Sequence, residues 1–176
     1  MQEVNYALKN GLIGVVSDTH IPARAPFLPS SLFGLLDGVD LILHAGDIEE
    51  ESVLDELRAL APVEAVAGNM DPLYLKMKLG LEKIVHLGEV SLGLIHGFGA
   101  PRGASDLLLQ KFSGSEIQGL IFGHSHVPLL EQRNEILLLN PGSVGDPRRG
   151  YPPSCALLSI KNRKLRAEIV YLQGSE

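Results

Sequence analysis

The chain has 176 residues, enough for one compact domain with a packed core. Its 45% hydrophobic and 20% charged residues are ordinary for a globular protein. The formal net charge of −6 argues against a broad basic surface, so bulk binding of DNA or RNA is not expected.

The single cysteine, Cys155, cannot form an internal disulfide, which argues against a disulfide-stabilised secreted fold. Residues 1–10 lack the apolar centre of a signal peptide, and no apolar run reaches the length of a membrane span. We therefore expect a cytoplasmic protein that does not bind membranes. Residues 1–176 are predicted to form a single domain in which residues 1–10 are a short prefix.

Short apolar runs recur along the chain, and each one ends in a polar motif. Their Val, Ile and Leu content predicts strands that are buried on both faces. The runs and their motifs are 11–16 before Ser17-Asp18-Thr19-His20, 41–43 before His44-Ala45-Gly46-Asp47, 63–67 before Gly68-Asn69-Met70-Asp71, 90–95 before His96-Gly97, and 120–122 before Gly123-His124-Ser125-His126.

Helices are predicted between these strands, at residues 30–36, 51–60 and 104–112. In the second of them Val53, Leu57 and Leu60 share one face, and Pro62 follows the end. The second half of the chain is typical of hairpins: residues 131–135 separate two strands, the second at 137–139. Strands at 156–160 and 165–172 flank the polar turn 161–164. The sum predicts an α/β sandwich with helices outside.

Every predicted strand end in this series carries an oxygen or imidazole ligand. In open α/β sheets, sites form at the carboxyl ends of strands, so these side chains are expected to meet. Taken alone, each motif has an ordinary explanation, such as a turn, a helix cap or a surface histidine. Their ordered combination favours a metal site, and the mixed nitrogen and oxygen ligands suit Mn, Fe, Zn, Co or Ni better than Ca or Mg.

The order Asp-x-His, Gly-Asp, Gly-Asn, His-Gly, Gly-His-x-His, spread over residues 12–148, resembles the signature of calcineurin-like metallophosphoesterases. The size of the chain and the stretch Asn140-Pro141-Gly142-Ser143-Val144, followed by Pro147-Arg148, resemble the YfcE-like phosphodiesterase branch. The resemblance implies a β-sandwich of two mixed sheets flanked by helices, in four layers, α/β/β/α.

The resemblance also implies two divalent metal ions, with Mn expected first and Ni, Co, Fe or Zn as alternatives. One ion would be held by Asp18, His20 and His126, the other by Asn69, His96 and His124, and Asp47 would bridge them. The implied reaction is hydrolysis of a small phosphodiester by a hydroxide that bridges the metal ions. Asp47, Asn69 and His96 are the catalytic candidates, and Asn69 and Arg148 are the candidates for substrate binding.

The third motif departs from the family, because Met70 stands where the family usually has a histidine thought to protonate the leaving alcohol. A thioether cannot donate a proton. We therefore expect much weaker hydrolysis of alkyl than of aryl phosphodiesters. The YfcE-like branch also tends to lack this histidine, so the departure agrees with the branch.

Several residues keep two interpretations at this point. Asp71 orients neighbouring groups or caps the following turn, and His44 supports a ligand or is a core histidine. Arg148 contacts phosphate or is a solvated loop residue. Arg149 is expected at the surface, and His86 at the surface or in a strand.

The alternative function is a catalytically weak or inactive protein-binding scaffold that resembles the retromer subunit of the same fold. Met70 favours it, whereas the complete ligand set favours the enzyme. A phosphomonoesterase would need more cationic groups, and a nuclease would need a basic groove or extra domains. The apolar C-terminal hairpin packs on the sandwich or forms a dimer edge, so a homo-oligomer stays open.

Overall fold

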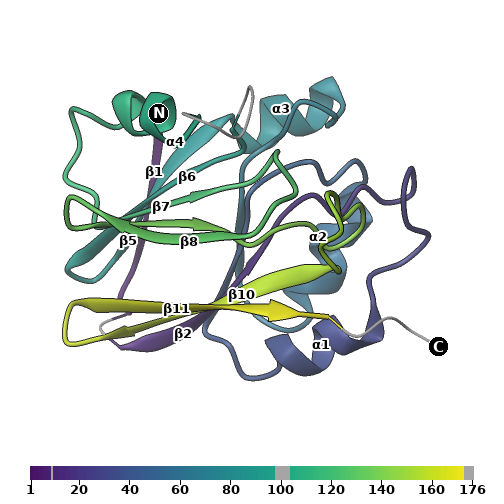
Figure 1. Cartoon of the computed structure of the whole chain (residues 1–176), viewed down its shortest axis with the longest axis horizontal. Coiled ribbons are helices and arrows are strands. Elements are labelled where there is room, and N and C mark those ends of the chain that lie inside the picture. Colours follow the sequence, from purple (N-terminus) through teal and green to yellow (C-terminus); the bar gives the residue numbers. More distant parts are fainter. Residues whose placement is uncertain (9, 98–103, 173–176) are drawn as a thin grey trace.

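Two mixed sheets face each other in the computed structural model, which describes residues 1–8, 10–97 and 104–172 (Figure 1). The six-stranded sheet has the order β1 (Gln2–Tyr6), β5 (Glu82–Leu87), β6 (Val90–Ile95), β7 (Gly119–Phe122), β9 (Ile136–Asn140), β8 (Leu129–Arg133). The five-stranded sheet has the order β11 (Lys164–Tyr171), β10 (Ser154–Lys161), β2 (Gly11–Val16), β3 (Leu41–His44), β4 (Val63–Ala65). The helices are α1 (Ser30–Leu36), α2 (Glu51–Arg58), α3 (Leu73–Leu79) and α4 (Ala104–Lys111).

Strand β2 explains why the sheets stack, because its successive side chains point to opposite faces. Ile13 and Val15 join the apolar cluster between the two sheets. Val16 packs on the other face, in the cluster to which α1, α2 and α3 contribute Leu36, Leu57 and Leu75. Both faces of the strand are therefore buried, as its continuous apolar run predicts.

The other outer face is covered by α4, whose Leu108 packs with Phe112, Leu120 and Phe122 against the six-stranded sheet. In Figure 1 α4 lies on the side of β6 and β7, and α1 lies beyond β2 and β10. The layers therefore follow the order α/β/β/α, and the predicted fold class is confirmed.

The prediction that residues 1–10 are a short prefix was wrong for residues 2–6. Residues Gln2–Tyr6 form β1, an edge strand that pairs in parallel with β5. The strand was missed because it is mostly polar and its partner lies about 80 residues along the chain. The helix α3 and the strand β5 were also missed, and His86 lies in β5.

Several predicted bounds need correction as well. Residues 131–133 belong to β8, so the turn before β9 contains only Asn134 and Glu135. The strand β4 ends at Ala65, α2 ends at Arg58 and α4 ends at Lys111. No helix within the described ranges is long and apolar enough to cross a membrane.

Candidate metal centre

The seven predicted ligands gather at one edge of the sandwich, where strands of both sheets end. They follow the strands closely in the chain: Asp18 and His20 after β2, Asp47 after β3, Asn69 after β4, His96 after β6, and His124 and His126 after β7. Because β2, β3 and β4 run parallel, as do β6 and β7, their carboxyl ends meet at the same edge.

The loops after β2 and β3 stay paired beyond the strands, which fixes their ligands side by side. The amide of Asp18 donates to the carbonyl of Gly46 over 2.9 Å, and the amide of His20 donates to the carbonyl of Asp47 over 3.1 Å. These backbone bonds, and the bridge between Ile21 and Glu49 that follows them, hold the two ligand loops next to each other.

The first group consists of Asp18, His20, Asp47 and His126, all buried, with one ligand atom from each lying within 4.8 Å of the others. His126 Nε2 lies 3.1 Å from Asp18 Oδ1 and 3.3 Å from His20 Nε2. His20 Nε2 lies 3.6 Å from Asp47 Oδ2. Two carboxylates and two imidazoles within such a space are a ligand set for a transition-metal ion.

The second group consists of Asn69, His96 and His124, and Asp47 touches it as well. His96 Nε2 lies 3.2 Å from both Asp47 Oδ2 and Asn69 Oδ1. His124 Nδ1 lies 2.9 Å from Asn69 Oδ1. The oxygen Asp47 Oδ2 therefore faces both groups, the position that a bridging carboxylate needs.

The orientation of three imidazoles is set by what their Nδ1 atoms contact. His96 Nδ1 lies 2.7 Å from the carbonyl of Ala45, His126 Nδ1 contacts the carbonyl of Asp146, and His20 Nδ1 lies 2.7 Å from a Glu49 oxygen. A carbonyl or carboxylate oxygen only accepts hydrogen bonds, so each Nδ1 carries the proton. In the neutral rings each Nε2 then directs a lone pair into the cluster, as a metal ligand does.

Asp18 gives an independent sign that a cation belongs here. Its Oδ2 accepts from Ser17 Oγ over 2.6 Å and from the His124 amide over 3.1 Å. Its Oδ1 is fully buried and has no hydrogen bond to any of the described residues. His126 Nε2 lies 3.1 Å away but carries no proton in the neutral ring, so it does not donate to this oxygen. A buried carboxylate oxygen without a hydrogen bond costs roughly 1–3 kcal/mol or more, and a metal ion would remove that cost.

The electrostatics of the cluster favour positive charge at its centre. Burial works against ionisation of Asp47, but its contacts with His96 hold the pKa of the carboxyl below its ordinary value. Burial likewise disfavours the charged form of His96 and His126, yet the neighbouring Asp47 and Asp18 carboxylates raise the pKa of both rings. In contrast, the pKa of His124 is lowered by burial and by His96.

Five of the seven ligand residues have a backbone conformation that, among the other described non-glycine residues, occurs at Glu49 and in turns and loops. Asp18, His20, Asp47, His124 and His126 have φ values of 53°, 48°, 55°, 71° and 57°, in the left-handed region that side chains with a Cβ rarely adopt. Such conformations persist when the surroundings impose them, and they concentrate at functional sites. Position 68 has no room for a side chain, because a Cβ on Gly68 would lie 2.1 Å from Asp47 Oδ1.

Asp71 binds the loops after β3 and β4 together. One carboxylate oxygen accepts the amides of Ile48 and Glu49 over 2.7 and 2.6 Å. The other accepts the amides of Gly68 and Asp47 over 2.7 and 3.1 Å. Of the two roles that the sequence allowed, orienting neighbouring groups or capping the following turn, the structure therefore favours the first: Asp71 orients the loops that carry the ligands.

His44 is a buried histidine with both ring nitrogens satisfied. Its Nδ1 accepts the amide of Gly46 over 3.1 Å, and its Nε2 lies 3.2 Å from Thr19 Oγ1. Burial lowers its pKa to about 4. It contacts loop residues beside the ligands and no ligand side chain directly, so the core interpretation fits it better.

Side chains of residues 140–143 form hydrogen bonds with the backbone of the loops that carry Asp18 and His124. Asn140 Nδ2 donates to the carbonyl of Gly123 over 3.0 Å, and Ser143 Oγ donates to the carbonyl of Asp18 over 2.7 Å. About half of the Arg148 side chain is exposed, and it donates to Asp146 Oδ2 over 2.9 Å. Arg149 is exposed.

Two residues that support the ligands, Glu49 and Asp146, were not predicted from the sequence. Glu49 holds the His20 ring, and the carbonyl of Asp146 holds the His126 ring. Glu49 follows Asp47 by two positions, so an acidic residue beside a ligand motif was the available signal. Asp146 carried none, because it follows no strand-end motif in the sequence, although both its carbonyl and its carboxylate, at 3.4 Å, lie beside His126 Nδ1 in the folded protein.

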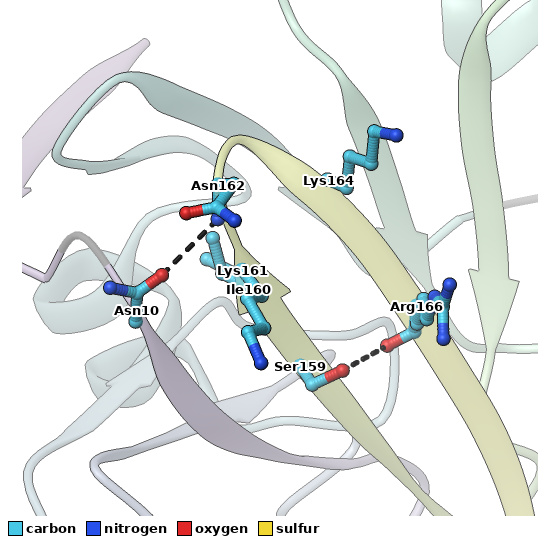
Figure 2. A pocket seen from close by; sticks show the side chains of 7 residues that line it. All are labelled: Asn10, Ser159, Ile160, Lys161, Asn162, Lys164 and Arg166. Atoms are coloured by element: carbon cyan, nitrogen blue, oxygen red, sulfur yellow. Dashed lines mark hydrogen bonds between the residues drawn. The ribbon is translucent and has the colours of Figure 1, made fainter.

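A separate pocket of about 750 Å³ lies at the turn between β10 and β11, and it shares no residue with the cluster (Figure 2). Lys161, Lys164 and Arg166 line it, together with polar side chains such as Asn10. Strand register pairs Ile160 with Gly11 at the start of β2, so this pocket lies at the end of β2 opposite Asp18. Its positive lining cannot hold a divalent cation.

Comparison with known proteins agrees with the class of site that this geometry defines, a metallophosphoesterase centre. Residues 12–163 match the model of the calcineurin-like phosphoesterase superfamily domain, so the chain belongs to that family. It is 44% identical to a probable metallophosphoesterase of Methanothermobacter thermautotrophicus over 90% of this chain and 91% of that protein. It is 41% identical to one of Methanocaldococcus jannaschii, over 92% of this chain and 82% of that protein.

Solved structures give the same fold. A Thermotoga maritima protein is 29% identical and superposes with a TM-score of 0.72, over 92% of this chain and 99% of that one. Vps29 of Chaetomium thermophilum superposes with a TM-score of 0.76 over 93% of this chain and 100% of that one. At 24% identity the second likeness shows the fold alone.

Proposed function

We propose that the protein is a phosphodiesterase that uses two divalent metal ions, with Mn as the first candidate. The observation that carries this proposal is the position of Asp47 Oδ2, which faces both groups of predicted ligands. Two-metal hydrolysis requires cations roughly 3.5–4 Å apart, and a shared carboxylate is the simplest way to hold them.

Asp18, His20 and His126 would hold one ion, Asn69, His96 and His124 the other, and Asp47 both. Bound there, the ions would lower the pKa of a bound water and neutralise charge on the phosphoryl oxygens.

The protein's own contribution is to orient the ligands. Met70 donates its amide to Asp47 Oδ1 over 2.7 Å, so the other oxygen of that carboxylate is directed at the cluster. The fixed Nδ1 protons of His20, His96 and His126 keep their Nε2 atoms available. The two groups are therefore pre-organised, which lowers the cost of ordering them for the reaction.

A diester fits the site better than a monoester, because a diester carries one negative charge where a monoester dianion carries two. Arg148 is the side chain we assign to substrate binding, and it is already paired with Asp146. Burial opposes ionisation of Asp146, but the bond from Arg148 holds its pKa below the ordinary value, so its negative charge offsets that of the guanidinium. A monoester dianion would need a further cation at the phosphoryl group itself, beside Arg148.

The test is hydrolysis of bis-p-nitrophenyl phosphate by chelator-stripped protein, with and without Mn²⁺, beside p-nitrophenyl phosphate. We expect Mn²⁺-dependent cleavage of the diester, little cleavage of the monoester, and loss of activity in Asp47→Ala. Asp55→Ala, at an exposed position of α2, is the matched control and should retain activity. No turnover with Mn²⁺, Ni²⁺, Co²⁺ or Zn²⁺, despite bound metal, would refute the enzyme and favour the scaffold alternative.

A further inference from the structure

An open pocket of about 360 Å³ adjoins the second ligand group. It lies where the carboxyl ends of β4 and β6 face each other, and α3 and α4 each contribute a lysine to its lining. Its lining residues are Ala67, Gly68, Asn69, Lys76, Leu81, Ile95, His96, Gly97 and Lys111. The volume lies within the range of small-molecule sites, about 300–1,000 Å³.

The pocket is continuous with the reaction centre, because Asn69 and His96 belong to both. The same Asn69 and His96 side chains contact each other over 3.2 Å in the second ligand group. A phosphodiester whose phosphorus lies at the cluster therefore has room for one of its two ester groups here.

The body of the pocket is apolar. Ala67 and Ile95 are buried, whereas Leu81 is 58% exposed on the β5 side. When an apolar ligand covers an exposed leucine, the apolar surface of both is removed from water, which favours binding. An aromatic or other apolar ester group would supply that cover.

The charged groups of the pocket are positive. Lys76 Nζ donates to the backbone carbonyl of Asn69 over 2.9 Å and keeps two further N–H donors for a ligand. Lys111 Nζ lies 3.3 Å from a Glu82 oxygen. Among the described residues that line the pocket there is no carboxylate and no Phe, Tyr or Trp ring, so these residues offer little attraction to a cationic group such as a quaternary ammonium.

We propose that this pocket binds one ester group of the phosphodiester substrate, an apolar group that carries an anionic substituent directed at Lys76. This assignment of substrate class rests on the proposed phosphodiesterase function.

The experiment compares three diesters with the same leaving group, in which the other ester group is methyl, phenyl or 4-carboxyphenyl. In each case the oxygen of water bonds to phosphorus, p-nitrophenolate leaves with the electron pair of its P–O bond, and the proton lost by the water passes to the solvent. For the wild-type protein we expect kcat/KM to rise from methyl to phenyl by roughly tenfold or more, the range of a small apolar group in a fitting pocket. A further rise is expected for 4-carboxyphenyl.

Two pairs of variants locate the effects. Leu81→Ser should reduce the advantage of phenyl over methyl several-fold, whereas Leu73→Ser, at an exposed leucine of α3 outside the pocket, should not. Lys76→Met should remove the advantage of 4-carboxyphenyl over phenyl. Lys78→Met, on the same helix but paired with Glu51, should leave it intact.

Binding of 4-carboxyphenyl phenyl phosphate to metal-free protein, followed by NMR, gives a second readout that needs no turnover. Lys76→Met should weaken that binding, and Lys78→Met should not. Absence of hydrolysis of all three diesters by metal-loaded wild type would refute the proposed function. Equal kcat/KM for methyl and phenyl in an active enzyme, or equal effects of the paired variants, would overturn the pocket assignment alone.

Discussion

Asp71 is the residue outside the ligand set whose replacement should affect the centre most. Its two carboxylate oxygens accept four backbone amides, those of Asp47, Ile48, Glu49 and Gly68, and its side chain is 2% exposed. Asp71→Asn keeps the shape but replaces one oxygen with an NH₂ group. That group faces two N–H donors instead of accepting from them.

The expected cost follows from those two lost bonds. A hydrogen bond to a charged group contributes about 1.5–3 kcal/mol, so we expect a loss of roughly 3–6 kcal/mol in the free energy of unfolding. That is a large share of the roughly 5–15 kcal/mol typical of a domain. The loops carrying Asp47 and Asn69 would also loosen, and metal affinity should fall by about 10- to 100-fold.

Urea unfolding of metal-free protein, followed by circular dichroism, measures the first effect, and titration with Mn²⁺ measures the second. Asp55→Asn is the matched control, since that side chain is 69% exposed and is paired with Arg58 at the surface. It should change stability by less than about 0.5 kcal/mol. An Asp71→Asn protein as stable as the control, with unchanged Mn²⁺ affinity, would refute the role given to the four amides.

Three further predictions concern single positions. Burial lowers the pKa of His44 from 6.5 to about 4, so the unfolded chain binds a proton at this position more readily than the folded protein. The contribution of neutral His44 to the free energy of unfolding is therefore fully present above pH 6.5 and is lost as the pH falls toward 4. Urea unfolding across that range should show wild type losing about 3 kcal/mol more than His44→Asn, and parallel curves would contradict this. Gly68→Ala places a Cβ 2.1 Å from Asp47 Oδ1 and should abolish the Mn²⁺-dependent rise in Tm. Gly34→Ala, in α1 with nothing within 4 Å of the added carbon, should instead stabilise by roughly 0.5–1 kcal/mol. Met70→His should raise hydrolysis of alkyl relative to aryl diesters, by up to about 10²-fold, and an unchanged leaving-group series would argue against the missing proton donor.

The layered fold and the identity of the clustered residues were predictable from local patterns. Continuous apolar runs such as that of β2 are buried on both faces in any parallel arrangement, so they predict central strands without knowledge of their partners. Residues of ligand type that recur at successive strand ends predict a shared site, because the carboxyl ends of parallel strands lie at the same edge of a sheet. The positions of Asp18, Asp47 and His96 follow from that rule.

The tertiary structure decided what depends on partners distant in the chain. The edge strand β1 has a mostly polar sequence and becomes a strand only because β5 offers a free edge. The functions of Glu49 and Asp71 depend on which amides and rings the folded loops bring within hydrogen-bonding distance. The pocket beside Lys76 forms only because the ends of β4 and β6, in different sheets, face each other. A sequence pattern encodes burial and periodicity along one segment, whereas hydrogen-bond partners and pockets arise from contacts between segments.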